Sequence, residues 1–354
     1  MILPATTLAS LLLLILTLFC WGSWANTQKL VFKWRFELFY YDFAVGVAIC
    51  VLIAVYGLGS ANPQELTVSD NMLIAGYRKM AYAGASGLII NLANIMLVAA
   101  IALSGMTVAF PIAFGTGLIV MSLTNYFGYP AGYNASLLFG GLVLILAAVL
   151  ADVFAYRSHL DALSSKSPGG PMLDPGTRLP VRSPKAVLGI TMSALSGLAW
   201  GFFIPLVDAS RSGENGVGPY GMAGLIGAGM VFSTLLYVPF FVNFPVQGEP
   251  VQVRSYFIGT KKQHFWGIFG GIVWTTGLVA ALVEGAGPLP VHTNPALASG
   301  LIFGAPILGV LWGLFAWREF RGSPQSVKML QFGMVVLFLA GLTLMSIAPV
   351  YASK

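Results

Sequence analysis

The sequence predicts an all-α membrane protein whose ten transmembrane helices form two inverted five-helix repeats. Three observations support this fold class: an apolar composition, ten apolar segments of spanning length, and an uneven distribution of Lys and Arg among the loops. Hydrophobic residues make up 57% of the 354 positions, charged residues make up 8%, and the mean hydropathy is +0.83. A soluble domain carries roughly 25% charged residues, so most of this surface has to face lipid.

The same composition argues against several classes of function. The net charge of +6 comes from 18 Lys and Arg residues and 12 acidic ones, too few to build a surface for a nucleic-acid partner. Cys20 and Cys50 both fall in apolar segments, so we expect buried packing and no disulfide framework. The three histidines lie in predicted loops or at segment ends, and no metal-binding or phosphate-loop spacing occurs. We therefore expect no enzymatic activity, no cofactor and no metal.

Ten apolar segments approach the roughly 20 residues that a helix needs to cross a bilayer core of about 30 Å. Each is expected to be helical, because a spanning segment has to satisfy its backbone internally. No Lys or Arg precedes the first, which is longer than a signal-peptide core, so it is expected to remain as the first helix. The third and fourth are joined only by 103–107, which predicts a tight helical hairpin. The segments are 4–26, 40–59, 82–104, 107–127, 134–155, 186–208, 220–243, 264–284, 294–317 and 327–349.

A polar segment at 157–185, rich in Pro, Gly and Ser, is predicted to be an irregular linker between the repeats 1–156 and 186–354. Most basic residues fall on its side of the bundle, so we expect a cytoplasmic linker and both termini outside. Because five is odd, the second repeat then enters the membrane from the opposite side, as in many secondary carriers with a site near the bilayer midplane. The basic residues on the other side are Arg78, Lys79, Arg211 and Lys354.

Polar and aromatic residues in the middle of apolar segments are the expected substrate contacts, because such groups are costly in lipid. Two asparagines three positions apart share one face of the third segment, and they either contact a ligand or join helices for about 0.6 kcal/mol each. A midplane Trp needs a polar partner or a cavity, with core packing as the alternative. A Phe-Gly pair recurs in the fourth and ninth segments. The candidates are Trp21, Trp24, Asn91, Asn94, Phe114, Thr116, Trp200, Trp274, Thr275 and Phe303.

The carboxylates give a weaker pattern, since all of those in or beside apolar segments lie near predicted segment ends. Most are expected to lie at the membrane interface or to pair with neighbouring basic residues. A proton-coupled carrier usually has a titratable group in its pathway. Asp42, which begins the second segment, and Glu284, which ends the eighth, are the candidates for that role.

Several short motifs resemble the drug/metabolite transporter superfamily, and within it the plant ureide permeases and their sugar-transporter relatives. They are Gly22-Ser-Trp24, Tyr41-Asp42, Gly87 with Asn94, Thr124-Asn-Tyr-Phe127, Trp312-Gly313 and Arg318-Glu-Phe-Arg321. The resemblance implies a central cavity lined by the first, third, fourth, sixth, eighth and ninth helices, and proton-coupled uptake of allantoin-like compounds and nucleobases. The linker lacks the phosphate-loop-like motif of the plant proteins, so nucleotide regulation is not expected.

The sequence thus favours a secondary transporter that takes up a small neutral polar metabolite, either a ureide or nucleobase or a sugar, with a coupling proton or ion. An exporter of aromatic drugs or metabolites uses the same scaffold and is the alternative. A non-transporting membrane receptor or subunit is the third hypothesis. The short linker and the lack of a targeting extension favour a bacterial inner membrane, while the oligomeric state is not predicted.

Overall fold

The computed structural model describes residues 1–31, 34–61, 66–165, 183–287, 291 and 293–352, and all of its regular elements there are helical. Nine helices in this part are long and apolar enough to cross a membrane. The first predicted segment contains α1, which has only 17 residues and falls short of that length. Each of the ten predicted segments coincides with a helix, and their arrangement as inverted repeats stays a prediction.

The α-helices are α1 Thr7–Ser23, α2 Asn26–Leu30, α3 Phe36–Leu52, α4 Val68–Ile74, α5 Tyr77–Ser104, α6 Met106–Gly128, α7 Ala135–Ser165, α8 Ser183–Arg211, α9 Pro219–Asn243, α10 Lys261–Glu284, α11 Pro295–Leu311 and α12 Gln325–Ile347. Short π-helical stretches, η1 Ile53–Leu58 and η5 Trp312–Ala316, extend α3 and α11. The 3₁₀ turns are η2 Pro130–Gly132 and η3 Val253–Ile258.

Two sequence-based boundaries were wrong. The first segment does not continue as one helix to residue 26, because α1 ends at Ser23 and the short α2 follows. The irregular linker is shorter than predicted, since α7 continues to Ser165 and α8 begins at Ser183. Its remaining residues, 166–182, lie outside the described part, as does His292. The predicted hairpin is tight, with Gly105 alone between α5 and α6 at a φ of +85°.

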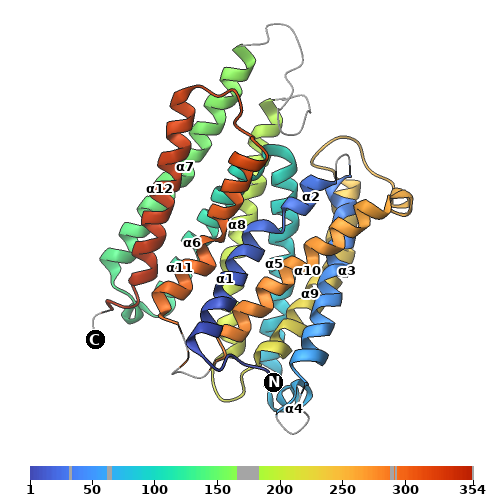
Figure 1. The fold of residues 1–354 in the computed structure, drawn as a ribbon, viewed down its shortest axis with the longest axis vertical. Coiled ribbons are helices and arrows are strands. Elements are labelled where there is room, and N and C mark those ends of the chain that lie inside the picture. Colours follow the sequence, from blue (N-terminus) through green and yellow to red (C-terminus); the bar gives the residue numbers. More distant parts are fainter. Residues whose placement is uncertain (32–33, 62–65, 166–182, 288–290, 292, 353–354) are drawn as a thin grey trace. The chain divides into compact units, whose positions relative to one another are not determined.

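The chain divides into two compact units, each containing residues from both sequence halves. Unit 1 comprises Met1–Ile95 and Phe202–Ala305, in which α10 packs on α1 and α3, and α9 packs on α3 (Figure 1). Small residues permit this packing: a Cβ added to Gly46 of α3 would overlap the carbonyl of Ile268, and one added to Gly271 of α10 would overlap that of Phe43. The backbones of α3 and α10 are therefore in direct contact.

Unit 2 comprises Met96–Gly201 and Pro306–Lys354, and its largest helix contact joins α7 and α12, which lie side by side in Figure 1. Glu319, which follows η5, accepts hydrogen bonds from the backbone N–H groups of Met106 (2.9 Å) and Thr107 (2.8 Å). This carboxylate caps the N-terminus of α6, where a negative charge is favourable.

Asp152 corrects the expectation that carboxylates sit at helix ends. The C-terminal extension of α7 places this residue well inside the helix, fully buried. Its Oδ1 accepts a hydrogen bond from Gln331 Nε2 of α12 at 3.0 Å.

Candidate functional site

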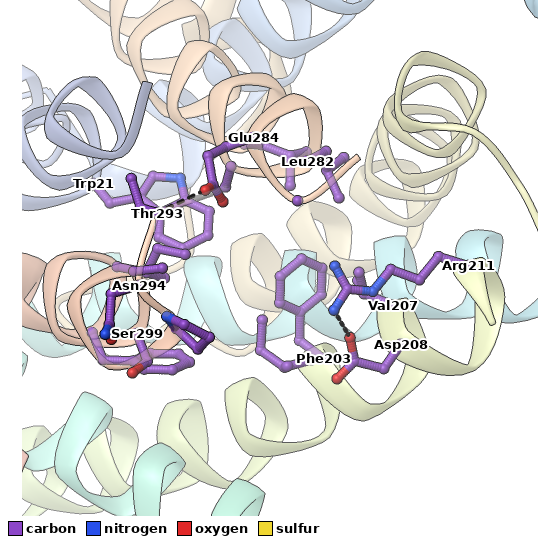
Figure 2. A pocket seen from close by; sticks show the side chains of 18 residues that line it. Trp21, Phe203, Val207, Asp208, Arg211, Leu282, Glu284, Thr293, Asn294 and Ser299 are labelled. Atoms are coloured by element: carbon purple, nitrogen blue, oxygen red, sulfur yellow. Dashed lines mark hydrogen bonds and ion pairs between the residues drawn. The ribbon is translucent and has the colours of Figure 1, made fainter. Parts of the chain in front are cut away.

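Unit 1 contains a cavity of about 630 Å³, shown in Figure 2. Its walls come from α1, from the C-terminal ends of α8 and α10, and from the first turns of α11 with the two residues before it. Binding sites for small molecules commonly occupy roughly 300–1,000 Å³ and combine apolar walls with a few polar groups. Most of the residues that line this cavity have aliphatic or aromatic side chains, and a few are polar.

One of the residues that line the cavity, Trp21, is stacked on a second tryptophan, Trp274. The rings of Trp21 in α1 and Trp274 in α10 have centroids 6.2 Å apart and planes inclined by 22°. Trp21 Nε1 donates to the carbonyl of Trp274 at 3.2 Å, so its polar atom is already bonded within the protein. Gly277 makes this approach possible, because a Cβ there would lie 2.7 Å from Trp21 Cδ1. Trp21 therefore lines the cavity without a free indole N–H.

Glu284 places a buried carboxylate in the same cavity. It is the last residue of α10 and only 5% exposed, and its Oε1 accepts a hydrogen bond from Thr293 Oγ1 at 3.0 Å. Within the described residues, no Lys, Arg or His forms an ion pair with it. The two oxygens of a carboxylate can accept several hydrogen bonds, so with one donor Glu284 has unused capacity to accept more.

An ion pair lies at the end of α8. Arg211 Nη2 is 2.8 Å from Asp208 Oδ1, and the side chains are 50% and 42% exposed. Figure 2 marks this pair separately from the Glu284–Thr293 bond. A second cavity, of about 570 Å³, shares Asp208 and Arg211 with the first and extends along the connection between α8 and α9. The pair thus lies where the two cavities adjoin.

Only part of the sequence-predicted set lines this cavity: Trp21, Phe303 and Glu284. Trp274 contributes by supporting Trp21. Trp24 is buried against Phe43, with ring centroids 5.1 Å apart.

Asn91 lies elsewhere in unit 1 and joins three helices. Its Oδ1 accepts from the Tyr40 hydroxyl of α3 at 2.9 Å, and its Nδ2 donates to Met230 O (2.9 Å), Ser233 Oγ (2.8 Å) and Thr234 Oγ1 (3.0 Å) of α9. Both ends of the carboxamide are occupied by protein groups, which supports the interhelical alternative over ligand contact.

Two further candidates are buried with polar atoms that have no hydrogen-bond partner among the described residues. These atoms are Asn94 Nδ2 and Thr275 Oγ1. The remaining three candidates belong to unit 2, where Phe114 packs against Trp200 with centroids 5.1 Å apart, and Thr116 lies beside Gly197.

Sequence reasoning missed Phe203, Arg211 and Thr293. The Asp208–Arg211 spacing of i, i+3 on one helix was an available signal, but Arg211 served only as an orientation marker. The bond between Thr293 and Glu284 depends on the turn between α10 and α11, which no local pattern specifies.

Asp42 is bound differently from Glu284. It is 1% exposed, and both of its oxygens accept from His264 Nδ1, at 2.9 and 3.0 Å. The hydroxyl of Tyr256 in η3 donates to Oδ1 at 2.6 Å. Burial, and then the hydrogen bond and charge of Asp42, raise the pKa of Tyr256. These three groups join the N-terminal parts of α3 and α10 to η3, the segment that precedes α10.

Comparison with known proteins agrees with a membrane transporter. No family model matches the chain. It is 20% identical to Ureide permease 2 of Arabidopsis thaliana, over 86% of this chain and 88% of that protein, and 20% identical to Ureide permease 4, over 94% and 95%. One solved crystal structure, 17% identical, covers 97% of this chain at a TM-score of 0.48. The distant, nearly full-length similarity to two permeases and the apolar helices together support a membrane transporter of small metabolites.

Proposed function

We propose that this protein is a secondary transporter for a small neutral polar metabolite, such as a ureide, a nucleobase or a sugar. The observation that carries the proposal is the cavity of unit 1, bordered by apolar helices and lined by aromatic rings and a few polar groups. The names of the two relatives favour a ureide among these substrates.

The proposed binding mode follows from the cavity walls. The Trp21 face, supported by Trp274, is suited to a flat ring or a sugar face, and Phe203 and Phe303 add aromatic surface. Glu284, Thr293 and Asn294 supply hydrogen-bonding groups that would orient the solute. Asn94 and Thr275, with their unpartnered atoms, remain candidates for a contact in another conformation.

The transport cycle we propose alternates access across two inverted repeats, with the linker cytoplasmic and both termini outside, in a bacterial inner membrane. Coupling to a proton or another ion is part of the proposal. Glu284 is its favoured carrier because it faces the cavity, whereas Asp42 is fully engaged by His264 and Tyr256.

The first experiment measures melting of the detergent-purified protein with allantoin, nucleobases, hexoses, amino acids and aromatic cations. A ligand at 100 times its Kd stabilises the folded state by about 2.7 kcal/mol. We expect one neutral polar class to raise the melting temperature, and the same class to enter proteoliposomes when an inward proton gradient is imposed. The proposal is abandoned if no neutral polar solute in the panel either binds or crosses.

Export of aromatic compounds is the second candidate, and the stacked Trp21–Trp274 pair is the observation in its favour. It predicts weak shifts from many bulky aromatics and flux driven outward by the proton gradient. A receptor or subunit that does not transport predicts binding without flux in either direction.

A further inference from the structure

The charged groups of the cavity are not equivalent, and the difference bears on its ligand. Its described titratable side chains are Asp208, Arg211 and Glu284. Arg211 is paired with Asp208 on the same helix, whereas Glu284 has a single neutral donor, Thr293. One negative charge is therefore left without compensation in the described cavity.

The surroundings of Glu284 leave a ligand as a suitable source of that compensation. Leu278, Ala281 and Leu282 of the same helix line the same cavity and offer no polar side-chain atoms. Asn294 and Ser299 line it as well, but neither donates a hydrogen bond to Glu284. A hydrogen bond to a charged group is worth roughly 1.5–3 kcal/mol, more than one between neutral groups. An N–H or ammonium donor on the ligand would gain this energy, and a ligand carboxylate would be repelled.

Trp21 sets a second requirement, on the shape of the ligand. Trp21 Nε1 is bonded to the carbonyl of Trp274, so the indole has no free donor for a ligand and its ring is the part left to make contact. The face of an indole also attracts cations. The ligand that fits both features is flat and carries N–H donors, with or without a positive charge, at one edge.

We propose that Glu284 determines the charge specificity of this cavity, by accepting hydrogen bonds from a donor-bearing or cationic edge of the ligand and excluding anionic solutes. The Asp208–Arg211 pair assists by occupying the guanidinium that would otherwise attract a carboxylate. This inference rests on the proposed function for its cavity and adds the residue that selects the ligand.

The test uses three probes of one shape and different charge: benzamidine, benzamide and benzoate. Their affinities for the purified full-length protein are measured by titration calorimetry. We expect benzamidine to bind the natural protein most tightly and benzoate most weakly. Glu284→Gln should weaken benzamidine about tenfold or more, which is the loss of about 1.4 kcal/mol, and should remove the ranking. Glu284→Asp, which keeps the charge, should retain the order of the three.

Two further variants separate charge selection from a loss of folding. Asp208→Asn releases Arg211, so benzoate should bind several-fold more tightly. Arg211→Gln leaves Asp208 without its ion-pair partner, so the affinity for benzamidine should rise several-fold. This change can be measured even if Glu284→Gln does not fold. Glu249→Gln makes the same chemical change at an exposed loop position and should alter nothing.

The inference is wrong if Glu284→Gln preserves the ranking, or if none of the three probes binds the natural protein at 100 mM or below. Failure of the proposed function gives a different result. A charge ranking that depends on Glu284, without flux of any solute in proteoliposomes, would retain the specificity residue and reject the transporter.

Discussion

Asp42 and Glu284 are both buried carboxylates of unit 1. Asp42 contacts His264 near the start of α10, and Glu284 is the last residue of that helix. Asp42 accepts three hydrogen bonds, from His264 and Tyr256, and these tie together α3, α10 and η3. Glu284 accepts one, from Thr293, and borders an open cavity. Burial alone therefore does not separate a structural carboxylate from a binding one. The two are separated by how much of their hydrogen-bonding capacity the protein leaves unused.

The largest expected effect is on folding, from Asp42→Ala. This substitution leaves the His264 ring nitrogen and the Tyr256 hydroxyl without their acceptor, and breaking a buried pair costs about 3–5 kcal/mol. Melting temperatures in detergent should fall by several degrees, and by less than half as much for Glu284→Ala. Asp161→Ala, at an exposed position of α7, is the matched control. If Asp42→Ala and Glu284→Ala lower the melting temperature equally, the distinction between these two carboxylates is wrong.

Asn91 and Asn94 extend the comparison to carboxamides on one helix. Asn91→Ala removes bonds to Tyr40 and to three groups of α9, each worth about 0.6 kcal/mol in a membrane protein. We expect a loss near 2 kcal/mol, by the same rule. Asn94→Ala should cost less than half of that, because its Nδ2 has no partner among the described residues. Melting of the two variants side by side tests the order, and a larger loss at Asn94 would reverse the argument.

Tyr256→Phe tests the hydrogen bond between Tyr256 and Asp42 through the pH dependence of stability. The pKa of Tyr256 is raised in the folded state, so its neutral form is favoured there. The stabilisation from this group is complete below the unfolded pKa of about 10 and declines as the pH rises above it. The melting difference between the natural protein and Tyr256→Phe should be constant from pH 7 to about 9 and shrink above about 10. A difference that grows at alkaline pH would contradict the assigned hydrogen bond.

The smallest effect is expected in unit 2, from Asp152→Asn. Asp152 Oδ2 and Gln331 Oε1 are both buried without a partner among the described residues, although the two side chains share one hydrogen bond. The carboxamide of Asn would supply an N–H donor to this pair. We expect the free energy of unfolding of Asp152→Asn to lie within about 1 kcal/mol of that of the natural protein. Asp152→Ala should lose about 2 kcal/mol, within the range for leaving a buried polar group unsatisfied. If Asn is tolerated no better than Ala, the pair does not lack a donor.

The sequence allowed the helices to be predicted but not most of the pairings between them. Hydropathy over 20 residues is a local property, so α6 and α9 begin and end within one residue of their predicted limits. Trp274, in mid-segment, and Trp21, nearer the end of its segment, are both predicted to need a polar partner or a cavity. Their stacking could not be foreseen, because 253 positions separate them and only the packing of α1 on α10 joins them.

The polar groups show the same limit. For Asn91 the sequence leaves ligand contact and helix joining as alternatives, since a carboxamide in an apolar segment does not reveal which groups lie opposite it. The four partners on α3 and α9 favour the second. The position of Asp42 in the sequence suggests a role in coupling, but nothing in the sequence indicates that His264, at the end of another segment, contacts both of its oxygens.

The direct backbone contact of α3 with α10 has a mechanical consequence. At 1.5 Å per residue, the 24 residues of α10 form a rod about 36 Å long. At Gly46 and Gly271 the two backbones meet with no side chain between them, and the Phe43–Trp274 and Asp42–His264 contacts join the same two helices on either side. The pair should therefore move as one lever, so that a tilt produced at Glu284 reaches the Asp42–His264 end undiminished. Spin labels on α3 and α10 should keep a constant separation whether or not a ligand is bound.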